Sequence, residues 1–214
     1  MANLKDDEHV TLVLIIRNEG EDRVLPSKKV LIYEIVGAIF IIFLGSAFHF
    51  TYELSGRLAI VGAFSAVNES VWEHLKLAFW PSLIWLLIEY LLIKKLTNNF
   101  LPSKTIGTCT MIALIPITFY SYTSITGGSI FAIDITTFIV AVIIGQIVSY
   151  TLFKKNQFSR NVDRIALVIL VVLGIAFIVF TFYPPHLPVF QDPITNGYGL
   201  ASFSIVRSVY LFTT

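Results

Sequence analysis

Three of the four histidines in this 214-residue chain stand at the ends of apolar runs or in the loops between them. They are His49, His74 and His186, and acidic residues lie near each of them. Imidazole and carboxylate groups are the ligands of catalytic zinc, which takes three protein groups and keeps one position for water. We therefore predict a Zn²⁺ ion held by these three histidines, which would lower the pKa of its bound water.

The most informative stretch is residues 67–76, Val-Asn-Glu-Ser-Val-Trp-Glu-His-Leu-Lys. On a helix, its polar side chains fall within an arc of roughly 160°, and they are Glu69, Ser70, Glu73, His74 and Lys76. The predicted catalytic residues are Glu69 and Glu73, either of which could take a proton from water as the general base.

A purely structural interpretation of the same stretch is that it begins a helix. Ser70 and Glu73 have the spacing of a capping box, and Asn68 offers an alternative cap. Acidic residues in a first turn also suit the helix dipole. This interpretation leaves His74 and Lys76 unexplained, because both can carry positive charge at a helix start.

Other polar residues are expected to orient the ligands, and they are Glu53, Asp134, Asp192, Asn68 and Lys76. His49 and Glu53 are four residues apart, so on a helix they share one face. An ion pair that caps the span is the alternative for this pair. Residues 183–193 contain four prolines, which prevent a helix and favour a stiff loop. That loop either holds His186 over the helix ends or is a rigid turn whose histidine faces water.

Composition decides the class of protein. Hydrophobic residues make up 56% of the chain and charged residues 14%, where soluble domains usually carry about 25% charged residues. A soluble globular domain and a disordered chain are therefore excluded. The net charge of +1 provides no basic surface for nucleic acid, and the single cysteine, Cys109, excludes an internal disulfide.

The ligands must be positioned by membrane-spanning helices. A span needs about 20 mostly apolar residues, and five runs meet that length: residues 30–50, 75–93, 105–124, 130–153 and 165–183. The predicted fold is an all-α polytopic membrane helix bundle with five spans. A polar N-terminal extension, residues 1–29, precedes the transmembrane helical domain, residues 30–214.

Two apolar segments are too short or too polar for a simple span. Residues 58–67 are too few to cross, so we predict a re-entrant or interfacial segment. Residues 199–214 carry Arg207 near their centre. They are predicted to form either an interfacial amphipathic helix or a marginal sixth span.

The distribution of Lys and Arg predicts the orientation. With five spans and a cytoplasmic N-terminus in the cell membrane, 12 of the 15 basic residues lie on the cytoplasmic side. The exceptions are Arg57, Lys76 and Arg207. The histidines and acids listed above then gather on the outer side. Glu34 and Glu89 fall near the cytoplasmic ends of spans, where we expect them to snorkel or to pair with the neighbouring lysines.

The stretch Asn68-Glu-Ser-Val-Trp-Glu-His-Leu-Lys76 resembles a hallmark of a prokaryotic family of multi-pass membrane proteins. His49-Phe-Thr-Tyr-Glu-Leu-Ser-Gly56 and Pro185-His-Leu-Pro188 extend the likeness. The family is domain-of-unknown-function family 6512. The resemblance implies a membrane protein and brings no activity with it.

Three functions are consistent with this pattern. The first is a metal-dependent hydrolase whose substrate, a lipid or an exported peptide, reaches the outer half of the bilayer. The second is a transporter or a proton or ion pathway, because acids inside membranes often relay protons. The third is a non-catalytic scaffold in which the polar residues only stabilise helix ends. All three have the lipid bilayer as a partner and exclude nucleic acid.

Overall fold

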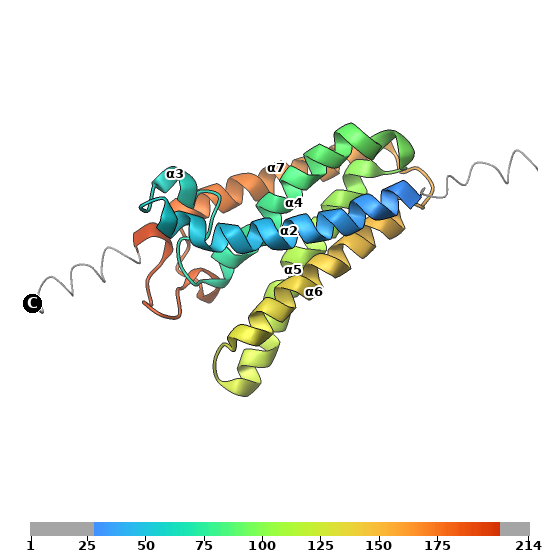
Figure 1. Ribbon diagram of the computed structural model, residues 1–214. Helices are drawn as coiled ribbons and strands as arrows, with labels where there is room; N and C mark the ends of the chain where they lie inside the picture. Colours follow the sequence, from blue (N-terminus) through green and yellow to red (C-terminus); the bar gives the residue numbers. More distant parts are fainter. Residues whose placement is uncertain (1–27, 202–214) are drawn as a thin grey trace, which may run out of the picture.

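The computed structural model describes residues 28–201 of the chain. Within them there are five long helices and four short ones, and Figure 1 labels the α-helices. The predicted N-terminal extension therefore lies almost wholly outside the described residues. So does most of the segment predicted to form an interfacial helix or a sixth span, of which residues 199–201 are described.

The five long helices are α2 (Lys28–Leu54), α4 (Val71–Ile93), α5 (Phe100–Thr126), α6 (Phe131–Leu152) and α7 (Arg160–Phe182). Each is long and apolar enough to cross a membrane. The described residues contain no strand, only an isolated bridge between Gln191 and Tyr198. The predicted all-α fold with five spans is confirmed, and the chain is an integral membrane protein.

Four of these helices begin earlier than the apolar runs indicate, and the starts of α4 and α5 determine where the polar residues lie. α4 begins at Val71 because Ser70 has extended backbone angles and its hydroxyl accepts a hydrogen bond from the Glu73 N–H. Ser70 is therefore the N-cap, as the capping-box interpretation predicted. α5 begins at Phe100, which adds residues 100–104 to the predicted span and places Lys104 inside the helix.

Glycines allow the closest helix contacts. α5 and α6 form a long hairpin, and α2 packs between α4 and α6. At the crossing of α5 and α6, a Cβ atom on Gly107 would lie 2.6 Å from the carbonyl oxygen of Gly145. Small residues at such positions let membrane helices approach closely. Towards its loop, the α5–α6 hairpin extends away from the other helices (Figure 1).

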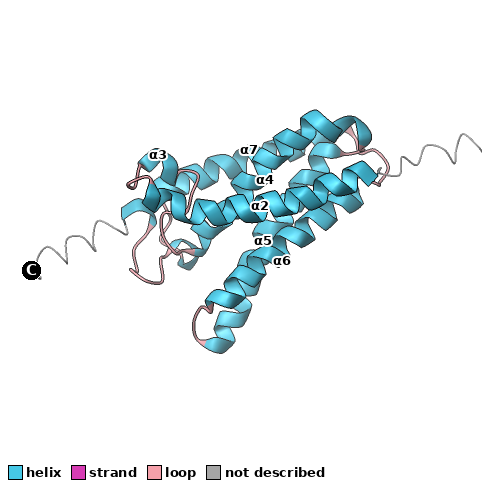
Figure 2. Cartoon of the chain, in the orientation of Figure 1, coloured by secondary structure: helices cyan, strands magenta, loops and turns pink. Residues whose placement is uncertain are grey.

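Three of the four short elements lie in connecting segments at one end of the bundle, and the fourth, η1 (Lys94–Leu96), follows α4 at the other end. Residues 58–67 form the single turn α3 (Ala59–Gly62) and a loop, so this segment does not cross the bundle. After α7, η2 (Pro188–Phe190) and η3 (Gly199–Ala201) interrupt a long loop. Figure 2 shows that the loops around α3 and those after α7 lie at the same end of the molecule.

The partner expected for Glu34 and Glu89 was wrong. Both side chains are buried and form ion pairs with Lys104, at 2.8 Å and 2.5 Å. We expected Glu34 and Glu89 to snorkel or to pair with the lysines next to them in the sequence, because Lys104 was expected to precede a span. Since α5 begins at Phe100, Lys104 instead faces into the bundle.

Candidate metal centre

Three side chains from two helices and one loop converge at the end of the bundle that carries α3. His49 lies near the end of α2, Glu69 lies in the loop before α4, and His74 lies in the first turn of α4. The Nε2 atoms of the two histidines are 3.2 Å apart. Glu69 Oε2 is 3.6 Å from His49 Nε2 and 3.4 Å from His74 Nε2.

The orientation of His74 is fixed by its other ring nitrogen. Nδ1 lies 2.9 Å from the carbonyl oxygen of Ser70, an acceptor, so Nδ1 carries the proton and donates it. In a neutral ring, Nε2 then has a free lone pair, and it is this atom that faces His49 and Glu69. A backbone carbonyl on the distal nitrogen is the usual support of a metal-ligating histidine.

The triangle formed by the three ligand atoms matches the size of a zinc site. With Zn–N and Zn–O bonds of about 2.0–2.1 Å, neighbouring ligands of a tetrahedral site lie about 3.3 Å apart. The three distances observed here, 3.2, 3.4 and 3.6 Å, are centred on that value. A single ion can therefore contact all three atoms without any backbone movement.

The centre is open on one side. The side chains of His49 and His74 are 30% and 31% exposed, and that of Glu69 is 42% exposed. An ion bound there would keep a position for water or substrate, as catalytic zinc sites do. The neighbouring His49 and His74 side chains hold the pKa of the Glu69 carboxyl well below its ordinary value, so Glu69 is a carboxylate at neutral pH.

Glu73 does not point to this centre. Its carboxylate forms a buried ion pair with Lys76 at 2.5 Å and accepts hydrogen bonds from the Val67 N–H and the Thr181 hydroxyl. Lys76 also donates to the carbonyl oxygen of Gly62. This network joins α4 to α7 and to both ends of the loop that leads to Glu69. Glu73 and Lys76 thus position the loop. Neither carboxylate oxygen of Glu73 is free to accept a proton on the exposed side.

The predicted arc of polar residues is therefore divided between two surfaces. Because α4 begins at Val71, Glu69 and Ser70 precede the helix and do not follow its periodicity. His74 turns towards α2, and the Glu73–Lys76 pair turns towards Thr181 of α7.

Asn68 also holds this loop in place, through two side-chain hydrogen bonds. Its side-chain oxygen accepts a hydrogen bond from the Ser70 N–H, and its amide donates to the carbonyl oxygen of Gly199. Asn68 is buried. It connects Ser70, the residue that precedes α4, with the segment after α7.

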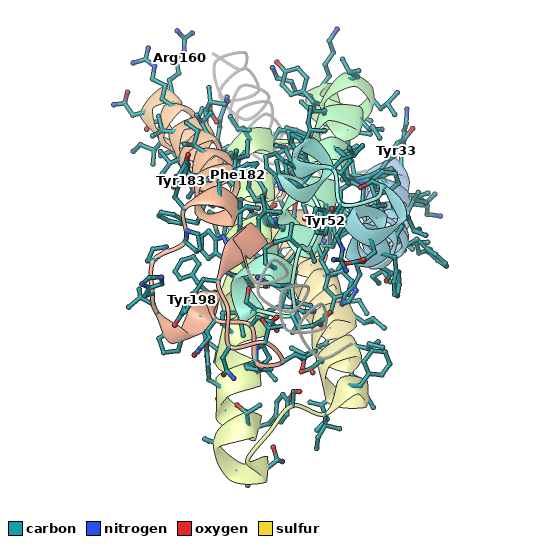
Figure 3. The ribbon with its side chains drawn as sticks, turned by 90° about the vertical axis from the view of Figure 1, so that its left-hand side faces the viewer. Tyr33, Tyr52, Arg160, Phe182, Tyr183 and Tyr198 are labelled. Atoms are coloured by element: carbon teal, nitrogen blue, oxygen red, sulfur yellow. The ribbon has the colours of Figure 1, made fainter. Side chains whose placement is uncertain are left out.

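Two predicted residues lie in the loop after α7 and make contacts there. The His186 ring packs on Tyr198 with a centroid distance of 4.6 Å, and Figure 3 labels Tyr198 in this loop. His186 is not in the group of close ligand atoms found among the described residues. Asp192 is buried and closes a turn, accepting hydrogen bonds from the Ile194 N–H and the Thr195 hydroxyl.

The remaining two predicted residues, Glu53 and Asp134, lie on α2 and α6. Glu53 pairs with Arg57 on the surface of the molecule, at 3.0 Å, and both side chains are about half exposed. Asp134 lies in the first turn of α6, where its carboxylate accepts a 2.5 Å hydrogen bond from the Tyr122 hydroxyl. Asp134 also interacts electrostatically with the His74 imidazole.

Several residues that shape the centre were missed at the sequence level. Thr181 supports the Glu73–Lys76 pair, and Tyr122 holds Asp134. Thr181 is the only hydroxyl residue in α7, in an otherwise apolar run, and that isolation could have indicated a polar partner. Tyr122 gave no comparable signal, because tyrosine is common near the ends of membrane helices.

A comparison with models of protein families identifies the family to which the chain belongs. A model described as "Family of unknown function (DUF6512)" matches residues 22–200, which include the described centre. No curated protein and no solved structure matches the chain.

Proposed function

Because the chain belongs to the DUF6512 family, whose function is unknown, we propose a function from the geometry: a zinc-dependent hydrolase embedded in the membrane. The observation that carries the proposal is the triangle of His49, Glu69 and His74 ligand atoms. Two histidines and one glutamate are an established ligand set of hydrolytic zinc enzymes. The bound ion would polarise a carbonyl oxygen and activate a water molecule at neutral pH.

The general base differs from the predicted one. Glu69 serves as a ligand and Glu73 is neutralised by Lys76, so neither is suited to accept the proton of the attacking water. Asp134 is the best remaining acid, because Tyr122 fixes its carboxylate and it interacts with the His74 side of the centre. Under this proposal Tyr122 and Asp134 form a pair that takes up the proton.

A lipid is the preferred substrate class. Near the centre, Leu58 and Ile60 are 56% and 74% exposed, although both lie outside the five spanning helices. Exposed apolar residues next to a polar site are typical of a segment that dips into the lipid interface. An ester or amide group of a lipid lies at that depth. An exported peptide is the alternative substrate.

The proposed location follows from the charge distribution. With the N-terminus in the cytoplasm, the centre faces the outer side of the cell membrane, and most lysines and arginines face the cytoplasm. The positive-inside rule supports this orientation.

The test is hydrolysis in proteoliposomes that contain ester- and amide-linked lipids. We expect the wild type to release fatty acid, a chelator to stop the release, and added Zn²⁺ to restore it. His74→Ala should remove the activity, whereas His186→Ala, which changes a histidine outside the centre, should keep it. Release that is unchanged by the chelator and by His74→Ala would refute a metal-dependent hydrolase. Cleavage of peptides but not lipids would refute the preferred substrate.

A second candidate function, a proton or ion pathway, is favoured by one further observation. The bundle buries two separate groups of charged residues, Glu73 with Lys76 and the acids around Lys104. Ionisable residues inside membrane helices often take part in ion movement. Proton flux into proteoliposomes that contain the protein, abolished by Glu69→Gln, would favour this candidate over the hydrolase.

A further inference from the structure

A second group of buried polar side chains lies at the other end of the bundle from the metal centre. Glu34, Glu89 and Lys104 come from α2, α4 and α5, and each is at most 4% exposed. Gln146 and Ser149 of α6 complete the group, which we call the inner cluster. Lys104 Nζ lies 2.8 Å from Glu34 Oε1 and 2.5 Å from Glu89 Oε2.

The charges of the inner cluster do not balance. Two carboxylates surround one ammonium group, so full ionisation leaves one buried negative charge. Gln146 cannot compensate for it, because its side-chain oxygen accepts from Lys104 and its amide donates to the Glu34 carbonyl. Ser149 donates only a long hydrogen bond to Glu34, at 3.4 Å. A buried charge without a counter-charge is strongly unfavourable, and such groups usually become neutral by binding a proton.

Carboxyl oxygen atoms without a hydrogen-bond partner could bind the proton. Among the described residues, Glu34 Oε2 and Glu89 Oε1 are buried and have no hydrogen-bond partner. Each of the two carboxyl groups therefore has one oxygen that can carry a proton while its other oxygen contacts Lys104. The charged side chains in contact with the cluster come from three helices, and α6 contributes only neutral groups.

We propose that the inner cluster is a proton-binding site in which Glu34 and Glu89 share one exchangeable proton next to Lys104. Glu34 is six residues from the start of α2 and Lys104 four from the start of α5. At about 1.5 Å per residue, the site lies roughly 6–9 Å inside the bundle. A proton can therefore come from water at that face. Phe153 stacks on Phe100 and lies over Lys104, which shields the cluster.

The test is infrared spectroscopy of the full-length protein in lipid, because a protonated carboxyl group has a C=O stretching band that a carboxylate lacks. We expect the wild type to show this band at neutral pH and to lose it as the pH is raised. Glu34→Gln and Glu89→Gln should each lose it, because the single remaining carboxylate pairs with Lys104. Glu53→Gln changes an exposed acid at the other end and should keep the band.

A third variant tests the charge balance in the opposite direction. In Lys104→Met, both carboxyl groups lack a counter-charge, so each should be protonated and the band should grow roughly twofold. The two glutamine variants keep a balanced pair and provide the decisive comparison if Lys104→Met does not fold. A wild type without the band, or a band that survives in both glutamine variants, would overturn the proposal. So would a band that sodium ions remove at constant pH, because the site would then bind a metal cation.

Discussion

At the scale of single residues, the candidate metal centre depends on the convergence of three side-chain atoms. The His74 ring is fixed by the Ser70 carbonyl at one nitrogen and presents the other to His49 and Glu69. The three ligand atoms come from different segments, so their convergence is a property of the tertiary structure. Removing one of them should affect metal binding far more than it affects folding, because all three side chains are partly exposed.

Glu69→Gln tests the carboxylate ligand. An amide keeps the shape of the side chain but lacks the negative charge that zinc prefers. Even a residue that only supports a ligand typically contributes about 10–100-fold to metal affinity, so we expect a loss of more than about 100-fold. Competition with a fluorescent zinc chelator measures the affinity. Glu53→Gln is the matched control, and equal affinities of the two variants would argue against Glu69 as a ligand.

Lys76→Met tests the support beneath the centre. Lys76 and Glu73 are both almost completely buried, and removing one partner of such a pair leaves an unpaired charge, which costs about 3–5 kcal/mol. We expect a clear fall in the thermal unfolding temperature in detergent. The double variant Glu73→Gln with Lys76→Met should recover part of that loss. A single variant as stable as the wild type would show that the pair does not hold the loop.

Residue types indicated the centre, but they could not select its members. His49 and His74 were predicted as ligands from their positions at the ends of spans, whereas Glu69 was predicted as a general base and not as a ligand. The sequence could not show that the His186 loop folds onto Tyr198, because no local pattern specifies which aromatic ring a loop histidine contacts. Glu73 was predicted as a general base because it falls on the same polar arc as Glu69 and His74, and the sequence could not show that Lys76 pairs with it inside the bundle.

At the scale of elements, the sequence predicted which segments are spanning helices but not where each helix begins. The apolar runs gave all five spans, because hydropathy over about 20 residues is a strong signal. The start of α5 at Phe100 was missed, and with it the burial of Lys104 among acids from two other helices. Charged residues near the end of a span look the same in the sequence whether they face water or the bundle. Gln146, the only amide side chain in α6, was an overlooked sign of the inner cluster.

The crossing of α5 and α6 gives a prediction at this scale. Gly107→Val would place side-chain atoms against the Gly145 carbonyl, where even a Cβ atom would lie only 2.6 Å away. Overpacking of this kind typically costs about 1–3 kcal/mol, so the helices should separate and the unfolding temperature should fall. Gly128→Ala, at a glycine with open space around it, is the control. Equal unfolding temperatures for the two variants would contradict the close crossing.

At the scale of the whole molecule, the two polar groups lie at opposite ends of the same helices. α2 carries His49 and Glu34, and α4 carries His74 and Glu89. In the proposed orientation, the metal centre faces outwards and the inner cluster lies near the cytoplasm. The arrangement requires that α3 does not cross the membrane. The segment between α2 and α4 then lies on the opposite side from the N-terminus, because α2 is the one span between them.

Labelling of single cysteines tests the orientation. In a variant with Cys109→Ser, we expect Ser129→Cys, between α5 and α6, to react with a membrane-impermeant maleimide in intact cells. Asn156→Cys, between α6 and α7, should react only after the membrane is permeabilised. The opposite result would place the candidate metal centre on the cytoplasmic side.

Elemental analysis of the purified protein shows whether His49, Glu69 and His74 hold a metal ion. We expect the wild type and His186→Ala, purified in mild detergent without chelator, to contain zinc at close to one ion per chain. His74→Ala should contain almost none while keeping its helical circular dichroism spectrum. A wild type that contains no metal after zinc is supplied, or a folded His74→Ala variant with the full zinc content, would contradict the account.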